Sequence, residues 1–344
     1  MRFIDLATDG GCSKKADATE LGSFLRTVAA ASESASLRGL SGTFPDVGLF
    51  RLGQMNCMAT VDVLFPMVPD AADFGKIAVN HVLGDVYAAF GIPCFALSVL
   101  GVPYGLEPTS PEVIQMMVGS VHELSRAGTT LIGGHTLAKQ ADLSLGFCVI
   151  AQAMTDATEP LRGIKEGDPI FLTKPLGTSI ASLLWKHAPQ LEEEFADVRA
   201  SMLETSLPAA RLLYRHGVTV CTDVTGFGLI NHLHRLLVRL DSAAEIFIDQ
   251  LPGFATTEQY YGEDLPTTSL YFHNLNHAAR FADINKASGH AKAALLFDAQ
   301  VAGGLLFALP VEHVLRIQDE FKTSGLAMHL IGRCRKGTAG NVII

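Results

Sequence analysis

The sequence lacks any long uninterrupted apolar segment. Its longest uncharged stretch spans residues 86–106 and is broken by glycine and proline at 91–93 and again between 101 and 105. A helix that crosses a bilayer needs roughly 20 consecutive apolar residues, so this stretch predicts a helix end, a turn and a buried strand instead. We therefore expect no membrane-spanning helix and no membrane partner.

Cysteine pairs, a secretory leader and basic clusters are lacking as well. The six cysteines lie singly, without a CxxC pair, which is typical of a reducing compartment. The N-terminus carries Asp5 and Asp9 but neither the basic flank nor the apolar core of a secretory signal, so we expect a cytoplasmic protein. A formal charge of −9 without a clustered basic face argues against nucleic acid as a partner.

What the sequence does contain is a regular alternation of helical and strand patterns, which is typical of mixed α/β (α+β) folds. Residues 111–126 repeat apolar positions at helical spacing, and residues 58–65 alternate as a strand does. Further strands are predicted at 94–100, 129–132, 144–153, 169–173, 218–221, 294–297, 305–309 and 328–331, and further helices at 17–31, 72–89, 180–187, 191–216, 229–240 and 311–322.

A break in this alternation predicts two domains. The stretch 156–168 is rich in charge, proline and glycine and has no periodicity, so we place the boundary there. The division is then a flexible N-terminal segment with glycine and lysine (1–20), an N-terminal domain (21–157) and a C-terminal α/β domain (158–344).

Four acids stand out by their positions. Asp223 follows the predicted strand 218–221 and precedes two glycines and an amphipathic run, so its carboxylate lies where the backbone turns from a strand into a helix. Asp62 lies in mid-strand between apolar neighbours, where a charge is costly unless it is paired or bound to metal. Asp46 and Asp85 also have ordinary structural explanations, as a turn former and a helix-end charge. Taken together, the four acids indicate a cation of the Mg²⁺ type that carries nucleotide phosphates.

Several histidines and glycines are more ambiguous. His81 precedes Asp85 by four residues, so both side chains project from one helical face, although a buried core histidine explains His81 equally well. The segment 132–136 places two glycines after a short strand, where backbone N–H groups can converge on an anion, but a tight turn explains the pair too. His232 and His234 lie two residues apart on a predicted helix, where their side chains diverge, so they are expected at the surface or at an edge. The P-loop and the GxGxxG fingerprint are both absent.

Near the N-terminus, Cys12 lies between two glycines and two lysines. Positive charge favours the thiolate, and glycines allow the segment to fold over a site. A basic terminus with an incidental cysteine is the alternative.

In this order the motifs resemble the selenide, water dikinase (selenophosphate synthetase) family of the aminoimidazole ribonucleotide synthetase-like superfamily. The most specific stretches are LTKPLG at 172–177 and TDVTGFG at 222–228, together with the glycine-flanked Cys12. The resemblance implies a two-domain fold in which the N-terminal domains of a homodimer close into a barrel-like sheet core, with a C-terminal α/β sandwich and ATP between the domains. It also implies the reaction, in which ATP, selenide and water give selenophosphate, AMP and orthophosphate.

The resemblance further implies roles for individual residues. Cys12 and Lys15 match the family's essential cysteine and lysine. The implied nucleotide contacts are Lys15, Asp62, Asp85, Gly133, Gly134 and His135, and the implied Mg²⁺ ligands are Asp46, Asp85 and Asp223.

This chain departs from the family pattern at several positions. Its residues 12–15 read Cys-Ser-Lys-Lys where the family usually has Cys-Gly-Cys-Lys, and His81 replaces the usual asparagine. Ala138 stands where an acid is common, and the segment 298–304 reads DAQVAGG instead of DPQTSGG. Two alternatives therefore stay open: a divergent superfamily member that uses ATP to activate another small substrate, and a catalytically quiet protein that binds ATP or senses selenium.

Overall fold

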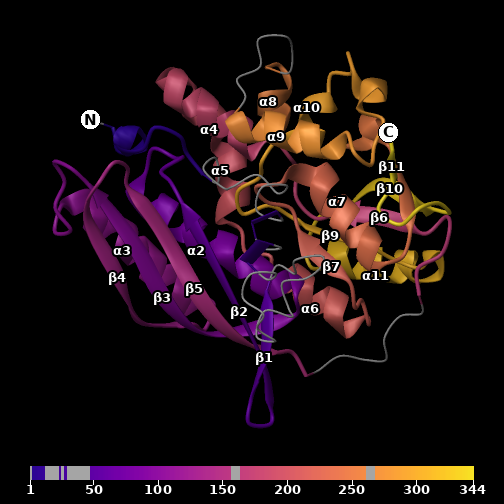
Figure 1. The fold of residues 1–344 in the computed structure, drawn as a ribbon, viewed down its shortest axis with the longest axis horizontal. Helices are drawn as coiled ribbons and strands as arrows, with labels where there is room; N and C mark the ends of the chain where they lie inside the picture. The colour runs from indigo at the N-terminus through magenta and orange to yellow at the C-terminus, as the bar shows by residue number, and fades with distance from the viewer. Residues whose placement is uncertain (1, 12–22, 25–26, 29–46, 156–162, 261–267) are drawn as a thin grey trace.

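The computed structural model describes residues 2–11, 23–24, 27–28, 47–155, 163–260 and 268–344. Figure 1 shows two sheets side by side, each with its own helices, and the mixed α/β class predicted from the sequence is confirmed. The predicted helix at 17–31 and the predicted domain boundary fall largely or wholly outside the described residues, and the boundary stays a prediction. In the described part of the chain, no helix is both long and apolar enough to span a membrane.

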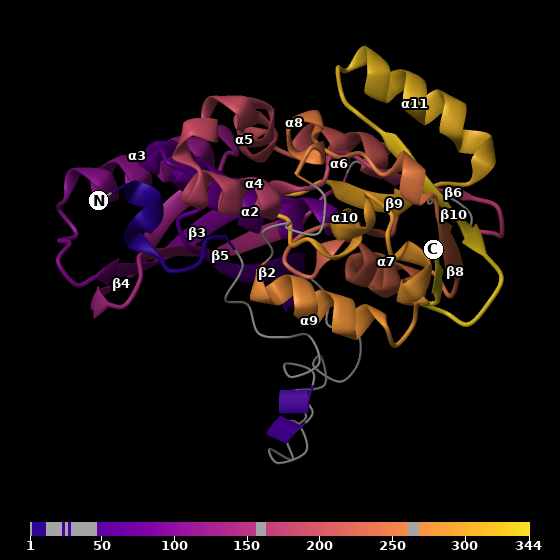
Figure 2. The same ribbon diagram turned by 90° about the horizontal axis from the view of Figure 1, so that it is seen from above.

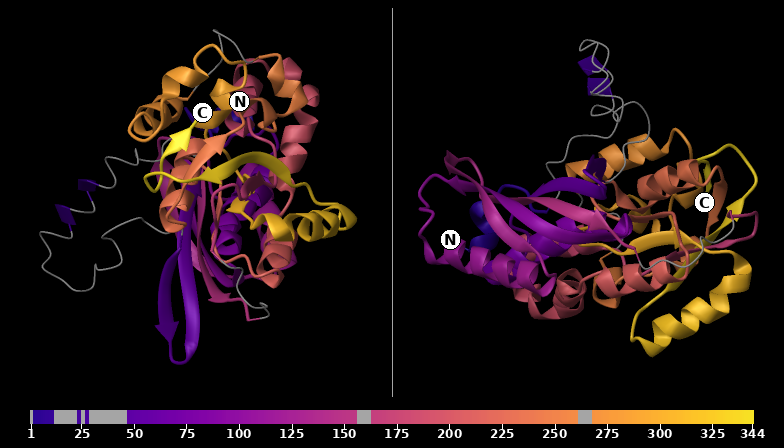
Figure 3. Two further views of the ribbon diagram at one scale, coloured as in Figure 1. Left: turned by 90° about the vertical axis from the view of Figure 1, so that its right-hand side faces the viewer. Right: turned by 90° about the horizontal axis from the view of Figure 1, so that it is seen from below.

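The first sheet has five strands in the order β1-β2-β5-β3-β4. Its strands are β1 (Gly48–Leu52), β2 (Met55–Leu64), β3 (Gly91–Pro103), β4 (Thr130–Gln140) and β5 (Ser144–Ala153). β3 and β4 pair in parallel, and the other pairs are antiparallel. β1 and the adjoining start of β2 form a hairpin that projects from the body of the molecule (Figures 1 and 3).

Helices α2 (Ala71–Ala88) and α3 (Pro111–Arg126) cover one face of this sheet. Asp70 caps the start of α2 by accepting a hydrogen bond from the N–H of Asp73, and Pro111 opens α3. Glycines allow the two helices to touch: a Cβ atom on Gly75 would overlap the carbonyl oxygen of Met116, and one on Gly119 would overlap that of Ala72. On the sheet's other face, the apolar side chains of Val61, Phe95 and Leu97 are exposed among the residues that the structure describes.

The second sheet has six strands in the order β11-β8-β10-β6-β9-β7. Its strands are β6 (Pro169–Leu172), β7 (Cys221–Asp223), β8 (Ala243–Ile246), β9 (Leu305–Ala308), β10 (His329–Arg335) and β11 (Val342–Ile343). The helices of this half are α4 (Thr178–His187), α5 (Ala196–Leu203), α6 (Leu207–Arg215), α7 (Gly228–Arg239), α8 (Ala255–Glu258), α9 (Ser269–Ala278), α10 (Ala293–Phe297) and α11 (Val314–Thr323). Helices α7, α9 and α10 lie on one side of the sheet, and α6 and α11 lie on the other (Figure 2).

Single turns of 3-10 helix complete the described chain. They are Phe3–Leu6, Pro189–Leu191, Glu193–Phe195, Ile248–Gln250, Ile284–Ala287 and Val311–His313.

Helix α2 joins the two halves of the molecule. It is buried along nearly its entire length, because it packs on β5 on one side and on α5 and β7 of the second half on the other. A helix enclosed in this way is apolar around most of its circumference. The Asn80 side chain donates to the carbonyl of Leu203, and His81 accepts from the backbone N–H of Ala302. Polar side chains of α2 thus reach directly into the second half.

The structure corrects four local predictions. The strand predicted at 218–221 is displaced to β7 at Cys221–Asp223, because its pairing with β9 involves these three residues. Residues 294–297, predicted as a strand, belong to helix α10, since a short apolar run that is buried on all sides has no readable period. The predicted helix at 191–216 is interrupted after Leu203, and Pro208 lies in the first turn of a new helix. The predicted strand at 129–132 continues as β4 to Gln140, so its two glycines lie in mid-strand and not in a turn.

Candidate active site

Three of the four predicted acids meet at helix α2. Asp85 lies on α2, and its Oδ2 accepts a hydrogen bond of 2.6 Å from the Thr60 hydroxyl on β2. Asp62, two residues further along β2, places Oδ2 3.6 Å from Nε2 of His81 on α2. Asp223 comes from the second half, and a Cβ atom on Gly84 would overlap its carboxylate. Gly84, the residue directly before Asp85, is therefore in contact with Asp223. An acid of the second half thus lies close to the acids of the first.

Strand and helix periodicity explain why these side chains converge. Thr60, Asp62 and Leu64 alternate with the exposed Val61 and Val63, so the polar pair faces α2. His81 and Asp85 lie one turn apart on the same face of α2, as the sequence predicts. The acids have little exposure: 8% for Asp85 and 1% for Asp223. Carboxylates with so little exposure are costly to keep charged unless they are hydrogen-bonded or bound to a cation.

The loop that carries Asp223 is held by His232. β7 ends at Asp223 and α7 begins at Gly228, which confirms the predicted passage from strand to helix. The N–H of Thr225 donates to Nε2 of His232 at 3.2 Å. The prediction of a surface position for His232 is wrong, because its exposure is 1% and its ring supports the loop from inside. His234 is partly buried and contacts the carbonyl of Gly340 instead.

Lys174 is a residue that the sequence analysis did not single out within LTKPLG. Its Nζ donates to the carbonyls of Ser201, Glu204 and Ala302, at 2.9, 2.6 and 3.0 Å. Burial lowers the pKa of this ammonium group to about 8, with the nearby acids opposing that effect. All three ammonium protons therefore have backbone acceptors, and Lys174 braces the loop that contains Ala302.

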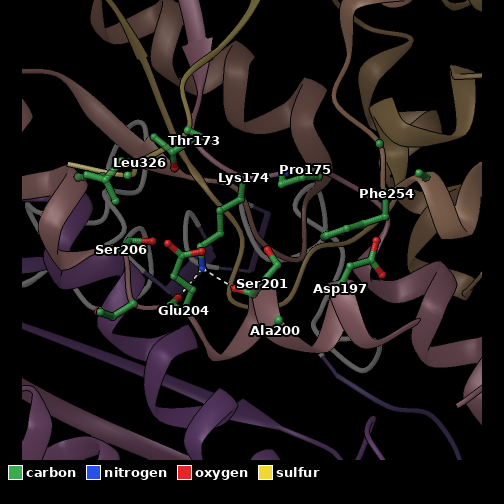
Figure 4. A pocket seen from close by; sticks show the side chains of 16 residues that line it. Thr173, Lys174, Pro175, Asp197, Ala200, Ser201, Glu204, Ser206, Phe254 and Leu326 are labelled. Atoms are coloured by element: carbon green, nitrogen blue, oxygen red, sulfur yellow. Dashed lines mark hydrogen bonds between the residues drawn. The ribbon is translucent and has the colours of Figure 1, made fainter. Parts of the chain in front are cut away.

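A cavity of about 470 Å³ lies on the side of Lys174 that faces α5. Figure 4 shows the side chains that line it. Asp197, Ser201 and Glu204 of the α5 region line it together with Phe254. None of the three acids at α2 lines this cavity. It is therefore separate from the acid cluster, although Lys174 contributes to its wall.

The segment 298–304 of the second half caps helix α4. Oε1 of Gln300 accepts from the N–H groups of Gly177 and Thr178, at 3.0 and 3.2 Å. The carboxyl of Asp298 accepts from Ser179 and Ile180, while burial raises the pKa of this carboxyl to about 8. The aspartate and the glutamine of this segment thus have a structural use at the start of α4.

The predicted nucleotide contacts Gly133, Gly134 and His135 lie elsewhere. They are exposed on the edge strand β4. Strand register places Asp62 opposite Phe147, Phe147 opposite Ser98, and Ser98 opposite Gly134. Gly134 is thus three strands away from Asp62 in the same row, which corresponds to about 14 Å. Within one chain the structure does not bring this segment to the acids.

The predicted residues Cys12, Lys15 and Asp46 lie outside the described residues. Their described neighbours border the cluster. Gly11 exchanges two backbone hydrogen bonds with Phe65, directly after β2, at 2.9 and 3.1 Å. A Cβ atom on Gly11 would also press against Val301. Gly11, the last residue before the first gap in the described chain, therefore lies next to the strand of Asp62 and the loop of Ala302.

The described residues contain no group of three or more His, Cys, Asp or Glu side chains placed to hold a metal ion. Asp85 and Asp223 nevertheless offer the hard oxygen donors that Mg²⁺ prefers. Mg²⁺ in nucleotide sites usually takes only one or two protein carboxylates and completes its shell with phosphate and water. The donor set therefore fits Mg²⁺ held jointly with a phosphorylated ligand, and does not form a closed protein cage.

Comparison with known proteins places this arrangement in a family. The family model of the AIR synthase related protein C-terminal domain matches residues 165–344, and that of the N-terminal domain matches residues 45–153. Among solved structures, thiamine monophosphate kinase from Aquifex aeolicus superposes with a TM-score of 0.64 at 20% identity, covering 95% of this chain and 97% of that one. Hydrogenase maturation protein HypE in complex with ATP gives 0.61 at 15% identity, covering 100% and 94%. At these identities the likeness shows the fold.

Relatives of known name identify a particular family among the AIR synthase related proteins. Selenide, water dikinase from Burkholderia cenocepacia is 30% identical over 342 residues, 98% of this chain and 95% of the relative. The protein of that name from Yersinia pestis is 28% identical over 349 residues, 100% of this chain and 97% of the relative. The chain belongs to the selenide, water dikinase family of the AIR synthase related proteins, and it is an enzyme of the phosphotransferase type.

Proposed function

We propose that this enzyme makes selenophosphate from ATP, selenide and water and releases AMP and orthophosphate. The observation that carries the proposal is the contact between Asp223 and the turn of α2 that presents Asp85, with Asp62 beside them. Carboxylates repel a polyphosphate, so acids that converge in this way bind one through a cation. Asp85 and Asp223, with Asp46, are the proposed Mg²⁺ ligands, and Asp62 and Asp85 are proposed nucleotide contacts.

The metal ion and the residues of the chain have separate roles in the proposed reaction. When bound, Mg²⁺ neutralises phosphate charge and polarises the transferred phosphoryl group. Lys15 offsets charge on that group, and Cys12 places the selenium nucleophile. Gly11 supports this assignment, because its two hydrogen bonds with Phe65 start the Cys12 segment beside the strand of Asp62.

In a homodimer, the segment 133–135 of one copy can contact a nucleotide that is bound at the acids of the other copy. Gly134 lies about 14 Å from Asp62 within the sheet of one chain, so the two residues do not contact the same phosphate group from one chain. β4 is an edge strand, and the sheet's open face exposes Val61, Phe95 and Leu97. We propose that two copies associate through this face and the β4 edge, and that the 133–135 segment of one copy contributes to the nucleotide site of the other.

Product analysis tests the reaction. Purified protein is incubated anaerobically with ATP, Mg²⁺ and selenide and followed by phosphorus NMR. A selenium-coupled phosphorus signal together with AMP is expected. ADP without AMP would instead identify a kinase-like member of the superfamily, and tight ATP binding without turnover would identify a quiet nucleotide-binding protein.

Substitutions test the residues. Asp62→Asn and Asp223→Asn are expected to abolish Mg²⁺-dependent ATP binding, because each removes a charge at the cluster, and unchanged affinity in a titration would refute the cluster. Cys12→Ser is expected to keep ATP binding and lose selenide-dependent AMP formation. Full retention of that activity would remove the role assigned to Cys12.

A further inference from the structure

His81 is fully buried on α2 and contacts both halves of the chain. The N–H of Ala302 donates a hydrogen bond of 3.0 Å to Nδ1 of the ring. A ring nitrogen that accepts a hydrogen bond carries no proton, so this imidazole is neutral and its single proton is on Nε2. The geometry of one backbone contact thus determines the tautomer of His81.

The protonated nitrogen faces an acid of the candidate site. Nε2 lies 3.6 Å from Oδ2 of Asp62, whose side chain is 12% exposed. This distance exceeds a full hydrogen bond, but in a buried setting an N–H dipole directed at a carboxylate still favours one orientation of that carboxylate. We propose that His81 is a positioning residue that sets the orientation of Asp62. The inference rests on the proposed function, in which Asp62 contacts the nucleotide.

The loop behind His81 is held by several contacts. Ala302 has a φ angle of +47°, a conformation that residues other than glycine rarely adopt. Its carbonyl accepts from Nζ of Lys174 at 3.0 Å while its N–H reaches His81. A Cβ atom on the neighbouring Gly303 would overlap the carbonyl of Val224, so the loop packs closely against the segment after β7. His81 therefore transmits a fixed position in the second half to Asp62 in the first.

A purely structural histidine, satisfied by Ala302 alone, is the competing explanation. Two conservative substitutions separate the explanations, because asparagine places a polar atom near the position of Nδ1 and glutamine places one near that of Nε2. His81→Asn keeps an acceptor for Ala302 and loses the donor that faces Asp62. His81→Gln keeps a donor toward Asp62 and loses the acceptor for Ala302.

The variants are compared by titration calorimetry with ATP and by thermal unfolding. His81→Asn is expected to unfold near the wild-type temperature and to bind ATP about threefold more weakly, because the 3.6 Å contact is weaker than a full hydrogen bond to a charged group. His81→Gln is expected to bind ATP nearly as wild type does and to unfold at a lower temperature. His234→Asn, a substitution of a partly buried histidine away from the acids, serves as the control and is expected to leave ATP affinity unchanged.

Nitrogen-15 NMR of the His81 ring supplies a readout that is independent of ligand and catalysis. A signal of the neutral Nε2–H tautomer is expected. A charged ring, the Nδ1–H tautomer, or wild-type ATP affinity in His81→Asn would each overturn the inference while leaving the proposed function intact. A protein that binds ATP normally but makes no selenophosphate would overturn the proposed function alone, and a wild-type protein that binds no ATP would overturn both.

Discussion

At the scale of single residues, Asp85 depends on a partner that has no chemical role of its own. The Thr60 hydroxyl donates to Oδ2 of Asp85 at 2.6 Å, and both side chains are buried. We expect Thr60→Val, which keeps the shape and removes the donor, to lower the free energy of unfolding by about 1.5–3 kcal/mol. ATP affinity should fall as well, because the carboxylate loses the contact that orients it. Urea denaturation and calorimetric titration measure the two effects.

Thr60→Ser is the matched control for this substitution. It keeps the hydroxyl, so ATP affinity should stay near that of the wild type. Equal affinity of the valine and serine variants would contradict the proposed orientation of Asp85 by Thr60.

Residue positions that follow from local periodicity could be predicted, and pairings across the fold could not. The shared face of His81 and Asp85 follows from a spacing of four, and the inward direction of Asp62 follows from strand alternation. Thr60 and Lys174 were missed because their partners lie 25 to 128 residues away in the chain. The position of His232 was predicted wrongly, because helical spacing shows only that the side chains of His232 and His234 diverge. Which of the two is buried depends on how α7 packs.

At the scale of elements, helix α2 serves the candidate site and the packing of the first half through two different glycines. A Cβ atom on Gly84 would displace the Asp223 carboxylate, whereas one on Gly75 would press into the backbone of α3. We expect Gly84→Ala to weaken Mg²⁺-dependent ATP binding with little loss of stability, since alanine favours a helix by about 1 kcal/mol over glycine. Gly75→Ala should instead destabilise the protein by about 1–3 kcal/mol, the usual cost of overpacking.

Calorimetric titration and urea denaturation of both glycine variants check this contrast. Strong ATP binding by Gly84→Ala would show that Asp223 has room to move, and the role assigned to that contact would then be lost.

The carboxyl of Asp298, which caps the start of helix α4, makes the stability of the protein depend on pH. Burial raises the pKa of Asp298 to about 8 from its ordinary value of 3.8, so the folded protein holds this proton where the unfolded chain has released it. The stabilising contribution is therefore complete below pH 3.8 and is lost as the pH rises toward 8.

Asp298→Asn should remove this dependence on pH. The wild-type free energy of unfolding minus that of the variant should decline by up to about 1.4 kcal/mol per pH unit between about pH 5 and 7.5. Urea denaturation of both proteins across this range measures the difference. Parallel curves would mean that Asp298 is ionised in the folded protein.

At the scale of the whole molecule, the alternation of patterns predicts the class, and the boundaries of the long elements follow closely. The helix predicted at 111–126 is α3, and that predicted at 72–89 is α2 with ends displaced by one residue. The strand order could not be predicted, because it depends on pairings between residues far apart in the sequence. The same holds for the contact between α2 and β7, which brings Asp223 close to Asp85. The barrel-like dimer core stays a prediction, because it requires a second copy of the chain.

The open face of the first sheet bears on that prediction. Val61, Phe95 and Leu97 point to the same side of the sheet and are 59%, 46% and 36% exposed. Contiguous apolar patches on a sheet favour association, since their burial removes them from water. We therefore expect light scattering to give the mass of a homodimer.

Phe95→Arg should shift that equilibrium to the monomer, because packing two copies face to face would bury an unpaired guanidinium group. ATP affinity should fall in parallel, since the proposed contribution of the 133–135 segment of a second copy would be lost. Leu315→Arg, at a side chain that is 82% exposed on α11 in the other half, is the control and should stay dimeric with normal affinity. A monomeric Phe95→Arg variant that binds ATP as tightly as wild type would place the whole nucleotide site within one chain, and the segment 133–135 would then lose its assigned contact.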